Sequence, residues 1–241
     1  MKRQCPCAAE TETKRPRTPT RALVLFKGTG SVDRVLEAMG YDVVSVDWNP
    51  RFKPTLVADV MELDFRNIWT AGDFDIVWAS PDCTQFSKAK TDGKRDLAKG
   101  CALVQRTIDI IEHLNPRMWF FENPATGLLP KQSVVAGIPY FTADYCCYWD
   151  DRLQSLMPYR KRTAFWTNAS PRLGKCRGVG RCPMMEKRHH VGSCGNGHST
   201  YNRNGRSSQI DKFIIPSTLV RILLESDVGN LAFVSPNSFK T

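Results

Sequence analysis

The sequence has no run of about 18 apolar residues, and no apolar stretch follows the charges of its first residues, MKRQCPCAAETETKRPR. The first absence excludes a membrane-spanning helix, and from the second we expect no secretory signal peptide. The phosphate-binding pattern G-x-x-x-x-G-K-[ST] is also missing, as is any internal repeat. Without a signal peptide, the nine cysteines are interpreted as reduced thiols of an intracellular protein rather than as a secreted disulfide framework.

The positive charge is concentrated in two segments. Residues 1–21 hold six Lys/Arg against two Asp/Glu, and residues 170–210 hold eight against one, so the remainder carries −1 of the net +10. Basic clusters release counterions from phosphates, which indicates a nucleic-acid partner; better solubility is the alternative. Residues 1–21 lack hydrophobic periodicity and are predicted to be a disordered basic arm, in which KRPR is either a nuclear import signal or simply part of the arm.

Strand and helix patterns alternate from residue 22 onward. An apolar run at 22–26 is followed by Gly28 and Gly30 and by a helix with Ser31 as its expected N-cap and Gly40 as its end. Residues 95–114 form a second helix pattern, with apolar residues at steps of four and three. Further strands are predicted at 42–46, 55–59, 74–80, 115–124, 138–149 and 163–168. With 41% hydrophobic residues, the chain is expected to form one α/β domain with a doubly wound, mostly parallel sheet.

Four functional side chains directly follow predicted strands. They are Asp47, Asp59, Cys83 and Glu122, and the carboxyl ends of parallel strands meet at one edge of a sheet. Asp47 stands where nucleotide-binding α/β folds place an acid for the ribose hydroxyls. Because the glycine turn lacks the third glycine of the dinucleotide pattern, an adenosyl cofactor without a pyrophosphate fits best.

Cys83 is a candidate nucleophile. Lys88, Lys90, Lys94 and Arg95 follow it, and cations beside a partly exposed thiol are expected to lower its pKa. Glu122 is expected to exchange a proton with a ring nitrogen. A cysteine and a carboxyl group beside an adenosyl cofactor suit addition to C6 of a pyrimidine, which makes C5 nucleophilic enough to accept a methyl group.

Five segments together resemble the DNA (cytosine-5) methyltransferases, in the order of that family. LFKGTGS resembles the cofactor loop, SPDCTQFS the Pro-Pro-Cys-Gln-x-Phe-Ser catalytic loop, and NPRMWFFENP the strand that ends in Glu-Asn-Val. YRKRTAFWTN is similar to the Gln-x-Arg-x-Arg segment, and IIPSTLVRILLES to the closing helix. Asp82, Thr84 and Pro124 replace the family's Pro, Gln and Val, which is more similar to small methylase-like proteins of phages and viruses. An anionic Asp82 is expected to raise the pKa of Cys83.

The resemblance implies a Rossmann-like fold that uses S-adenosylmethionine, and it implies a role for each matching residue. The thiolate of Cys83 would add to C6 of a flipped cytosine while Glu122 protonates N3, with Arg160 and Arg162 orienting Glu122 and the base and Asn123 supporting the loop. The residues implied to bind the cofactor are Phe26, Gly28, Gly30, Asp47, Asp59 and Pro81. Lys88, Lys90, Lys94 and Arg95 resemble the mobile loop that closes on phosphates; a solvated charge run is the alternative.

A short basic segment replaces the family's long target-recognition domain. Only 47 residues separate Asn168 from Pro216, and the segment at 169–212 has too few aliphatic residues for its own core. One interpretation is a zinc site from Cys176, Cys182, His190 and Cys194. The other is a loop that becomes ordered on DNA, with Arg177, Arg181 and Arg188 among its phosphate contacts.

The predicted organisation is a basic arm at 1–21, a methyltransferase domain at 22–226 with the insertion at 169–212, and a C-terminal tail at 227–241. The function expected is S-adenosylmethionine-dependent DNA cytosine-5 methylation. An RNA (tRNA-type) cytosine-5 methyltransferase and an inactive methyltransferase-like DNA-binding protein remain as alternatives. We expect a monomer that binds double-stranded DNA, located inside the cell: in the nucleus if eukaryotic, otherwise in the host cytoplasm.

Overall fold

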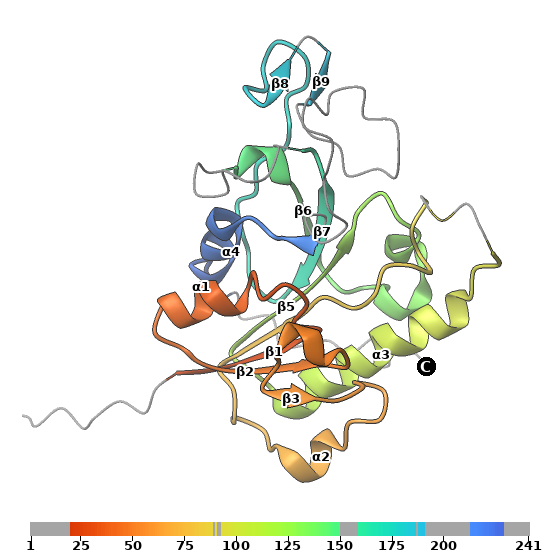
Figure 1. The fold of residues 1–241 in the computed structure, drawn as a ribbon, viewed down its shortest axis with the longest axis vertical. Coiled ribbons are helices and arrows are strands. Elements are labelled where there is room, and N and C mark those ends of the chain that lie inside the picture. Colours follow the sequence, from red (N-terminus) through yellow and green to blue (C-terminus); the bar gives the residue numbers. More distant parts are fainter. Residues whose placement is uncertain are drawn as a thin grey trace, which may run out of the picture.

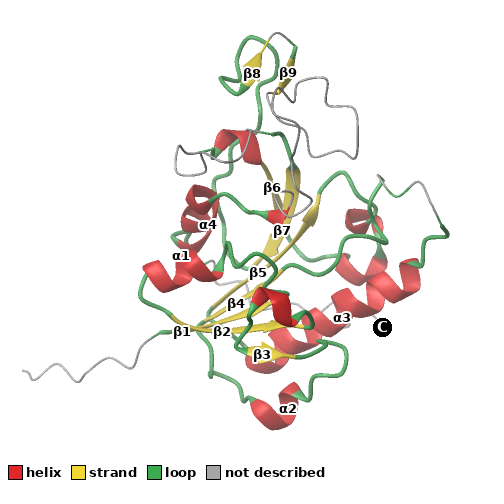
Figure 2. Cartoon of the chain, in the orientation of Figure 1, coloured by secondary structure: helices red, strands yellow, loops and turns green. Residues whose placement is uncertain are grey.

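The fold is built on one seven-stranded sheet (Figures 1 and 2). The computed structural model describes residues 20–88, 90, 93–149, 159–186, 188–190 and 213–228. The strand order is β3-β2-β1-β4-β5-β7-β6; β7 runs antiparallel to both of its neighbours, and the other pairings are parallel. The strands are β1 (Arg21–Leu25), β2 (Asp42–Asp47), β3 (Leu56–Val57), β4 (Ile76–Ala79), β5 (Met118–Pro124), β6 (Tyr140–Asp144) and β7 (Arg162–Thr167). The predicted doubly wound, mostly parallel sheet is confirmed.

Helices cover both faces of the sheet. The helices α1 (Asp33–Ala38) and α4 (Ser217–Leu224) lie on one face, and α2 (Phe65–Ile68) and α3 (Leu97–Leu114) on the other (Figure 1). The residues of β1 alternate between these layers, since Leu23 and Leu25 pack with the α3 side whereas Ala22 and Val24 pack with the α1 side. Strands buried on both faces explain the continuous apolar runs of the sequence.

Short elements complete the fold. Single turns of 3-10 helix occur at η1 (Pro50–Phe52), η2 (Leu129–Lys131), η3 (Ser133–Val135) and η4 (Tyr145–Cys147). A separate two-stranded hairpin, β8 (Met185–Glu186) and β9 (His189–His190), lies at the end of the molecule opposite α2 (Figure 1). In the part of the chain that the structure describes, no helix is long and apolar enough to span a membrane.

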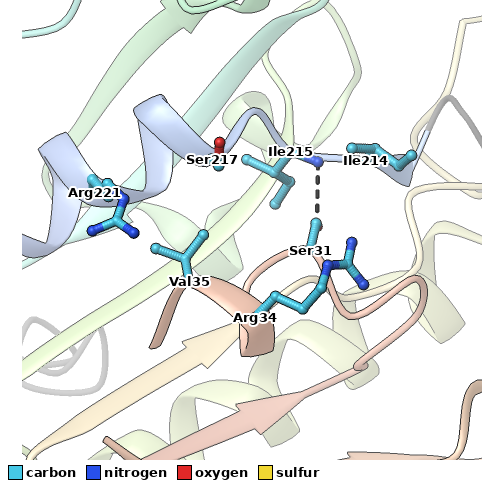
Figure 3. A pocket seen from close by; sticks show the side chains of 7 residues that line it. All are labelled: Ser31, Arg34, Val35, Ile214, Ile215, Ser217 and Arg221. Carbon is cyan, nitrogen blue, oxygen red and sulfur yellow. Dashed lines mark hydrogen bonds between the residues drawn. The ribbon is translucent and has the colours of Figure 1, made fainter. Parts of the chain in front are cut away.

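The predicted helix ends agree with the structure, whereas α3 starts two residues later than predicted and the first cap differs. Asp96 caps α3 by accepting the Lys99 backbone N–H at 2.8 Å, and Gly40 ends α1 with φ +86°. The assignment of Ser31 as the N-cap of α1 is wrong, because the cap position is Val32. The hydroxyl of Ser31 instead accepts the Ile215 backbone N–H at 3.3 Å, which ties α1 to the segment that enters α4 (Figure 3).

Two predicted domain boundaries shift by one or two residues. Arg21, assigned to the basic arm, is already the first residue of β1. At the other end, Val228 forms a bridge with Ala169, and the Asp227 carbonyl accepts the Ser170 N–H at 3.0 Å, so these two residues belong to the domain rather than to the tail. The remaining residues of the arm and tail, 1–19 and 229–241, lie outside the described residues, as do residues 191–212 of the insertion.

Candidate active site

The cofactor side of the site is a glycine turn after β1. Phe26, Gly28 and Gly30 have φ values of 61°, 51° and 68°, a left-handed backbone that glycine adopts without strain. Asp47, at the end of β2, holds this turn: one carboxylate oxygen accepts the Gly28 N–H at 2.9 Å, and the other accepts the Asn49 N–H at 2.9 Å. Each carboxylate oxygen keeps a second lone pair for a ligand hydroxyl.

Three further residues line this edge. Asp59 is exposed beyond β3, where it accepts the Met61 N–H at 2.9 Å, and Phe26 is half-buried against the core. Trp48 was missed by the sequence analysis: it follows Asp47 directly, and 71% of its surface is exposed. An exposed indole beside a cofactor turn offers a flat apolar face. The signal available in the sequence was an aromatic residue placed immediately after the strand-end acid.

A cavity adjoins the glycine turn. It has a volume of about 210 Å³ and lies between α1 and α4 (Figure 3). Ser31, which directly follows Gly30, lines it together with Arg34, Val35, Ile214, Ile215, Ser217 and Arg221. Residues of α4 and residues next to the glycine turn thus line the same cavity, as the resemblance implied for the closing helix.

The Cys83 loop is fixed at both of its ends. Pro81 is buried, and its carbonyl accepts the Asn123 side-chain N–H at 2.9 Å, so Asn123 supports the loop as expected. After Cys83, the fully buried Phe86 donates its N–H to the Cys83 carbonyl at 3.0 Å. The Phe86 carbonyl accepts the Leu128 N–H at 2.9 Å. These hydrogen bonds hold the loop against the end of β5 and the turn that follows it.

Glu122 lies beside Cys83. The register pairs Ala79 of β4 with Phe121 of β5, so Glu122 extends one residue past the last pair, level with the start of the Cys83 loop. Only 8% of Glu122 is exposed, and its Oε2 has no hydrogen-bond partner among the described residues. A buried, unsatisfied carboxyl oxygen is costly unless a ligand completes it, which marks Glu122 as a ligand contact.

Burial raises the pKa of the Cys83 thiol. The nearby Lys161 ammonium opposes this shift, whereas the Glu122 and Asp82 carboxylates add to it. The expected effect of Asp82 is therefore confirmed, but the expected net lowering of the pKa is wrong, because desolvation outweighs the cation. The cation that lowers the pKa is Lys161, directly before β7, and its distance from Cys83 along the sequence gave no indication of this role.

Arg160 and Arg162 both bind Asp144, which the sequence analysis did not select. Arg162 makes a bidentate ion pair, with Nε to Oδ1 at 3.1 Å and Nη2 to Oδ2 at 2.9 Å. Arg160 Nε donates to Oδ1 at 3.2 Å. The side chain of Asp144 is fully buried at the end of β6. The guanidinium of Arg162 is therefore held by Asp144, and the role predicted for Arg160 and Arg162, orienting Glu122 and the base, stays a prediction.

Burial alone would raise the pKa of Asp144. Hydrogen bonds from Arg162, the Cys176 backbone N–H and Arg160 outweigh it and hold that pKa below its usual range.

Tyr145, the next residue along the chain, is another buried group that the sequence did not reveal. Burial raises its pKa well above the usual range, and the Glu122 carboxylate adds to the shift. Its ring also lies 5.2 Å from the Lys161 ammonium, measured to the ring centroid. Tyr145 is therefore a buried neighbour of Cys83 and Glu122.

The cationic loop after Cys83 divides into two kinds of side chain. Lys90 donates to Gln85 Oε1 at 3.1 Å and to the Lys94 carbonyl at 3.2 Å, and Arg95 donates to the carbonyls of Ser87 and Lys90. Lys90 and Arg95 thus brace the loop, which differs from the expectation that all four cations contact phosphates. Lys88 and Lys94 are exposed.

The basic insertion presents its charges to solvent. Arg177, Arg181 and Arg188 are all exposed. Of the predicted metal ligands, Cys176, Cys182 and His190 come together with Cys146, which had been assigned to a strand. The fourth predicted ligand, Cys194, lies outside the described residues.

A family model and a known viral protein both match this chain. A model of the family described as C-5 cytosine-specific DNA methylase matches residues 20–133. A protein of Frog virus 3 (isolate Goorha), named a probable DNA (cytosine-5)-methyltransferase, is 32% identical over 224 residues, which cover 84% of this chain and 98% of the relative.

Two solved structures are more distant matches. The Entamoeba histolytica methyltransferase EhMeth has a TM-score of 0.43 and 14% identity, with 71% of this chain and 58% of that chain covered. A mutant of Spodoptera frugiperda DNMT2 has a TM-score of 0.41 and 17% identity, with 70% and 53% covered. This chain thus spans little more than half the length of either structure.

Proposed function

Since the chain belongs to the C-5 cytosine-specific DNA methylase family, we propose that it methylates C5 of cytosine in DNA with S-adenosylmethionine as the methyl donor. The observation that carries the proposal is the position of Cys83 beside Glu122, at the ends of the neighbouring strands β4 and β5. A nucleophilic thiol and an unsatisfied carboxyl oxygen side by side match the two positions of a pyrimidine ring that must be activated, C6 and N3.

The chain's own residues carry the covalent steps. Cytosine leaves the duplex at a cost of about a few kcal/mol and enters the site beside Cys83 and Glu122. Cys83 gives its proton to water and its sulfur forms a bond to C6, while Glu122, in its protonated form, donates that proton to N3, so that electron density moves to C5. After C5 has gained the methyl group, it gives its proton to water, the bond from sulfur to C6 breaks, N3 returns its proton to Glu122, and the released thiolate takes up a proton. The 5-methylcytosine product and the free thiol result.

Because the pKa of Cys83 is raised, the thiol must lose its proton before it can react. The resting thiol holds its proton, and Lys161 is the cation placed to stabilise the thiolate when it forms. A free Cys83 requires reduced cysteines, and the six cysteines in the described part of the chain are all free. The proposed reaction therefore belongs in a reducing compartment inside a cell.

The residues at the neighbouring strand ends suit the methyl donor, S-adenosylmethionine. Gly28 and Gly30 leave the backbone open to close approach, Asp47 and Asp59 offer carboxylate oxygens to hydroxyl groups, and the exposed Trp48 indole offers a stacking face to adenine. Bound here, S-adenosylmethionine supplies an electrophilic methyl group for C5. Pro81 is buried behind the Cys83 loop, where its carbonyl holds Asn123, so we assign it a role in the loop's shape.

Duplex DNA is the proposed substrate because exposed basic side chains lie on the loop after Cys83 and on the insertion. Lys88 and Lys94 stand on the loop that follows Cys83, and Arg177, Arg181 and Arg188 stand on the insertion. Side chains of this kind bind phosphates and position the duplex without reading its sequence.

Covalent trapping tests the proposal. The full chain is incubated with S-adenosylmethionine and a pool of duplex oligonucleotides that contain 5-fluorocytosine, whose fluorine blocks loss of the group at C5. We expect a cofactor-dependent band on a denaturing gel that is absent for Cys83→Ser. For Glu122→Gln, the rate at which the band forms should fall about a hundredfold or more. Cys101→Ser, which alters a half-buried cysteine of α3, is the control and should retain the band.

The other outcomes separate the alternatives. A band formed only with structured RNA would transfer the same chemistry to an RNA substrate. If the protein binds both S-adenosylmethionine and DNA but forms no adduct with either nucleic acid, the catalytic proposal is wrong and a binding protein remains.

A further inference from the structure

Three cysteines and a histidine from separate parts of the chain meet at the base of the insertion. The Sγ atoms of Cys146, Cys176 and Cys182 and a ring nitrogen of His190 all lie within 4.8 Å of one another. Cys146 belongs to η4 after β6, the other two cysteines to the loop after β7, and His190 to β9. This cluster takes no part in the chemistry proposed for Cys83 and Glu122.

The distances match the edges of a tetrahedron around one ion. His190 Nε2 lies 3.4 Å from Cys176 Sγ and 3.5 Å from Cys182 Sγ. For zinc bonds of about 2.3 Å to sulfur and 2.0–2.1 Å to nitrogen, tetrahedral geometry places sulfur and nitrogen about 3.6 Å apart and two sulfurs about 3.8 Å apart. We propose that Cys146, Cys176, Cys182 and His190 bind one Zn²⁺ ion in a closed, structural site.

The surroundings suit thiolate ligands. The Gly178 N–H donates to Cys176 Sγ at 3.4 Å, and the Cys182 N–H closes the same turn by donating to the Gly178 carbonyl at 3.0 Å. Gly178 and Gly180 have φ values of +80° and +72°, which explains why glycines separate the two cysteines. This tight turn accommodates a spacing of five residues between ligands.

Charge balance also favours the ion. Three thiolates and a neutral imidazole leave one net negative charge around Zn²⁺. The Arg160 guanidinium interacts electrostatically with Cys176 and His190, and Arg162 interacts with Cys176 and Cys146. These two arginines are also the partners of Asp144, whose carboxylate accepts the Cys176 backbone N–H at 2.9 Å. The ion would thus be linked through Asp144 to the arginines beside the active site.

The segment needs such a link because it has almost no core. Among the described residues from 172 to 190, only Cys182 is buried. Gly174 lies against η4, where a Cβ atom would stand 3.2 Å from the Cys147 Cβ, so the chain passes too close to η4 for a larger residue. A structural zinc ion supplies folding free energy that buried apolar side chains supply elsewhere.

Metal analysis of the purified full chain is the direct test. We expect one equivalent of zinc per chain by elemental mass spectrometry, and ligand-field bands of a tetrahedral cobalt thiolate after replacement by Co²⁺. Cys176→Ser should lose most of the metal, whereas Cys101→Ser and Cys147→Ser, which alter cysteines outside the cluster, should keep it. Cys147 is the sharper control because it is adjacent to a proposed ligand.

A second measurement avoids variants that fail to fold. Alkylation of the native chain, read residue by residue by mass spectrometry, should leave Cys146, Cys176 and Cys182 protected until a chelator removes the metal, while the exposed Cys147 reacts throughout. A chain free of zinc after growth with zinc, equal metal content in Cys176→Ser, iron in place of zinc, or a disulfide between these cysteines would each overturn the proposal. Because these readouts do not use methylation, failure of the zinc site and failure of the proposed activity are distinguishable.

Discussion

At the scale of single residues, the environment of Cys83 determines when its thiol reacts. Burial and two carboxylates raise its pKa, and the Lys161 ammonium acts against them by stabilising the thiolate. The reactive form is the thiolate, so the rate of adduct formation should increase with pH through the neutral and mildly alkaline range. This dependence makes Lys161 and Asp82 opposing determinants of the rate.

We predict that Lys161→Met slows adduct formation with 5-fluorocytosine DNA by about two- to tenfold at pH 7, because the pKa of Cys83 rises further. Asp82→Asn should accelerate it, because a carboxylate that disfavours the thiolate is removed. Both are measured as single-turnover rates at saturating DNA from pH 6.5 to 9, with Lys99→Met on the exposed part of α3 as the control. Parallel pH profiles for all four proteins would contradict the assignment.

Trp48 carries the second prediction at this scale. Its exposed indole follows Asp47, and stacking of a base on an aromatic ring contributes about 1–3 kcal/mol. Trp48→Ala should therefore weaken S-adenosylmethionine binding by about five- to a hundredfold in calorimetry, while Trp48→Phe keeps a stacking face and most of the affinity. Equal affinities for the Ala variant and the native chain would remove Trp48 from the site.

At the scale of elements, Phe86 connects the catalytic loop to the helices behind it. A Cβ on Gly100 of α3 would stand 2.9 Å from the Phe86 ring, and a Cβ on Gly127 would stand 3.1 Å from the Phe86 carbonyl oxygen. Gly100 therefore leaves room for the ring, and Gly127 leaves room for the carbonyl oxygen. The packing of Phe86 holds the loop that bears Cys83 against α3 and the turn after β5.

Phe86→Ala should lower the free energy of unfolding by about 3–5 kcal/mol, the usual cost of removing a buried aromatic ring. The matched control is Phe213→Ala, since 60% of Phe213 is exposed and the cost there should stay below about 0.5 kcal/mol. Urea unfolding measures both. A similar cost at the two positions would show that Phe86 does not anchor the loop.

Asp144 gives the fold a predictable response to acid. Its pKa is depressed in the folded state, so its contribution is present above the unfolded pKa of about 3.9 and is lost as the pH falls through the lower, folded value. Asp144→Asn should cost about 1–3 kcal/mol at pH 7, and the difference from the native chain should shrink near pH 3. Asp42→Asn, which removes an exposed pair with Arg21, should change little at either pH. A difference for Asp144→Asn that is independent of pH would contradict this account.

The elements that sequence patterns predicted well are those with local signals. Hydrophobic periodicity located α3, and strand-end positions located Asp47, Cys83 and Glu122. Asp144 and Lys161 could not be found in this way. They reach the site only because β7 pairs antiparallel with both β5 and β6, a register that no local pattern specifies.

Burial was equally hard to foresee. The sequence shows cations after Cys83 but not the desolvation that outweighs them, so the direction of its pKa shift was predicted incorrectly. Cys146 was overlooked as a metal ligand for a related reason, because YCCYW has the composition of a core strand. Only the three-dimensional structure brings its sulfur to Cys176 and His190.

At the scale of the whole molecule, exposed basic residues lie at opposite ends of the protein (Figure 1). The hairpin of β8 and β9 lies at one end of the protein and α2 at the other (Figure 1). Basic residues of the hairpin and of α2 therefore lie far from each other. We expect a duplex bound at the active site to contact the insertion rather than α2. The salt dependence of DNA binding can therefore distinguish a specific phosphate surface from general positive charge.

We predict that replacing Arg177, Arg181 and Arg188 with Gln weakens binding to duplex DNA. The slope of log K against log salt should fall by about 0.9 for each phosphate that an arginine no longer neutralises, nearly 3 for the triple variant. Arg66→Gln, an exposed arginine of α2, should leave the slope unchanged. Fluorescence anisotropy at several salt concentrations measures both, with unfolding curves to show that each variant is folded. If the triple variant keeps the native slope, the insertion does not contact DNA, and the exposed lysines of the Cys83 loop become the only phosphate ligands of the proposal.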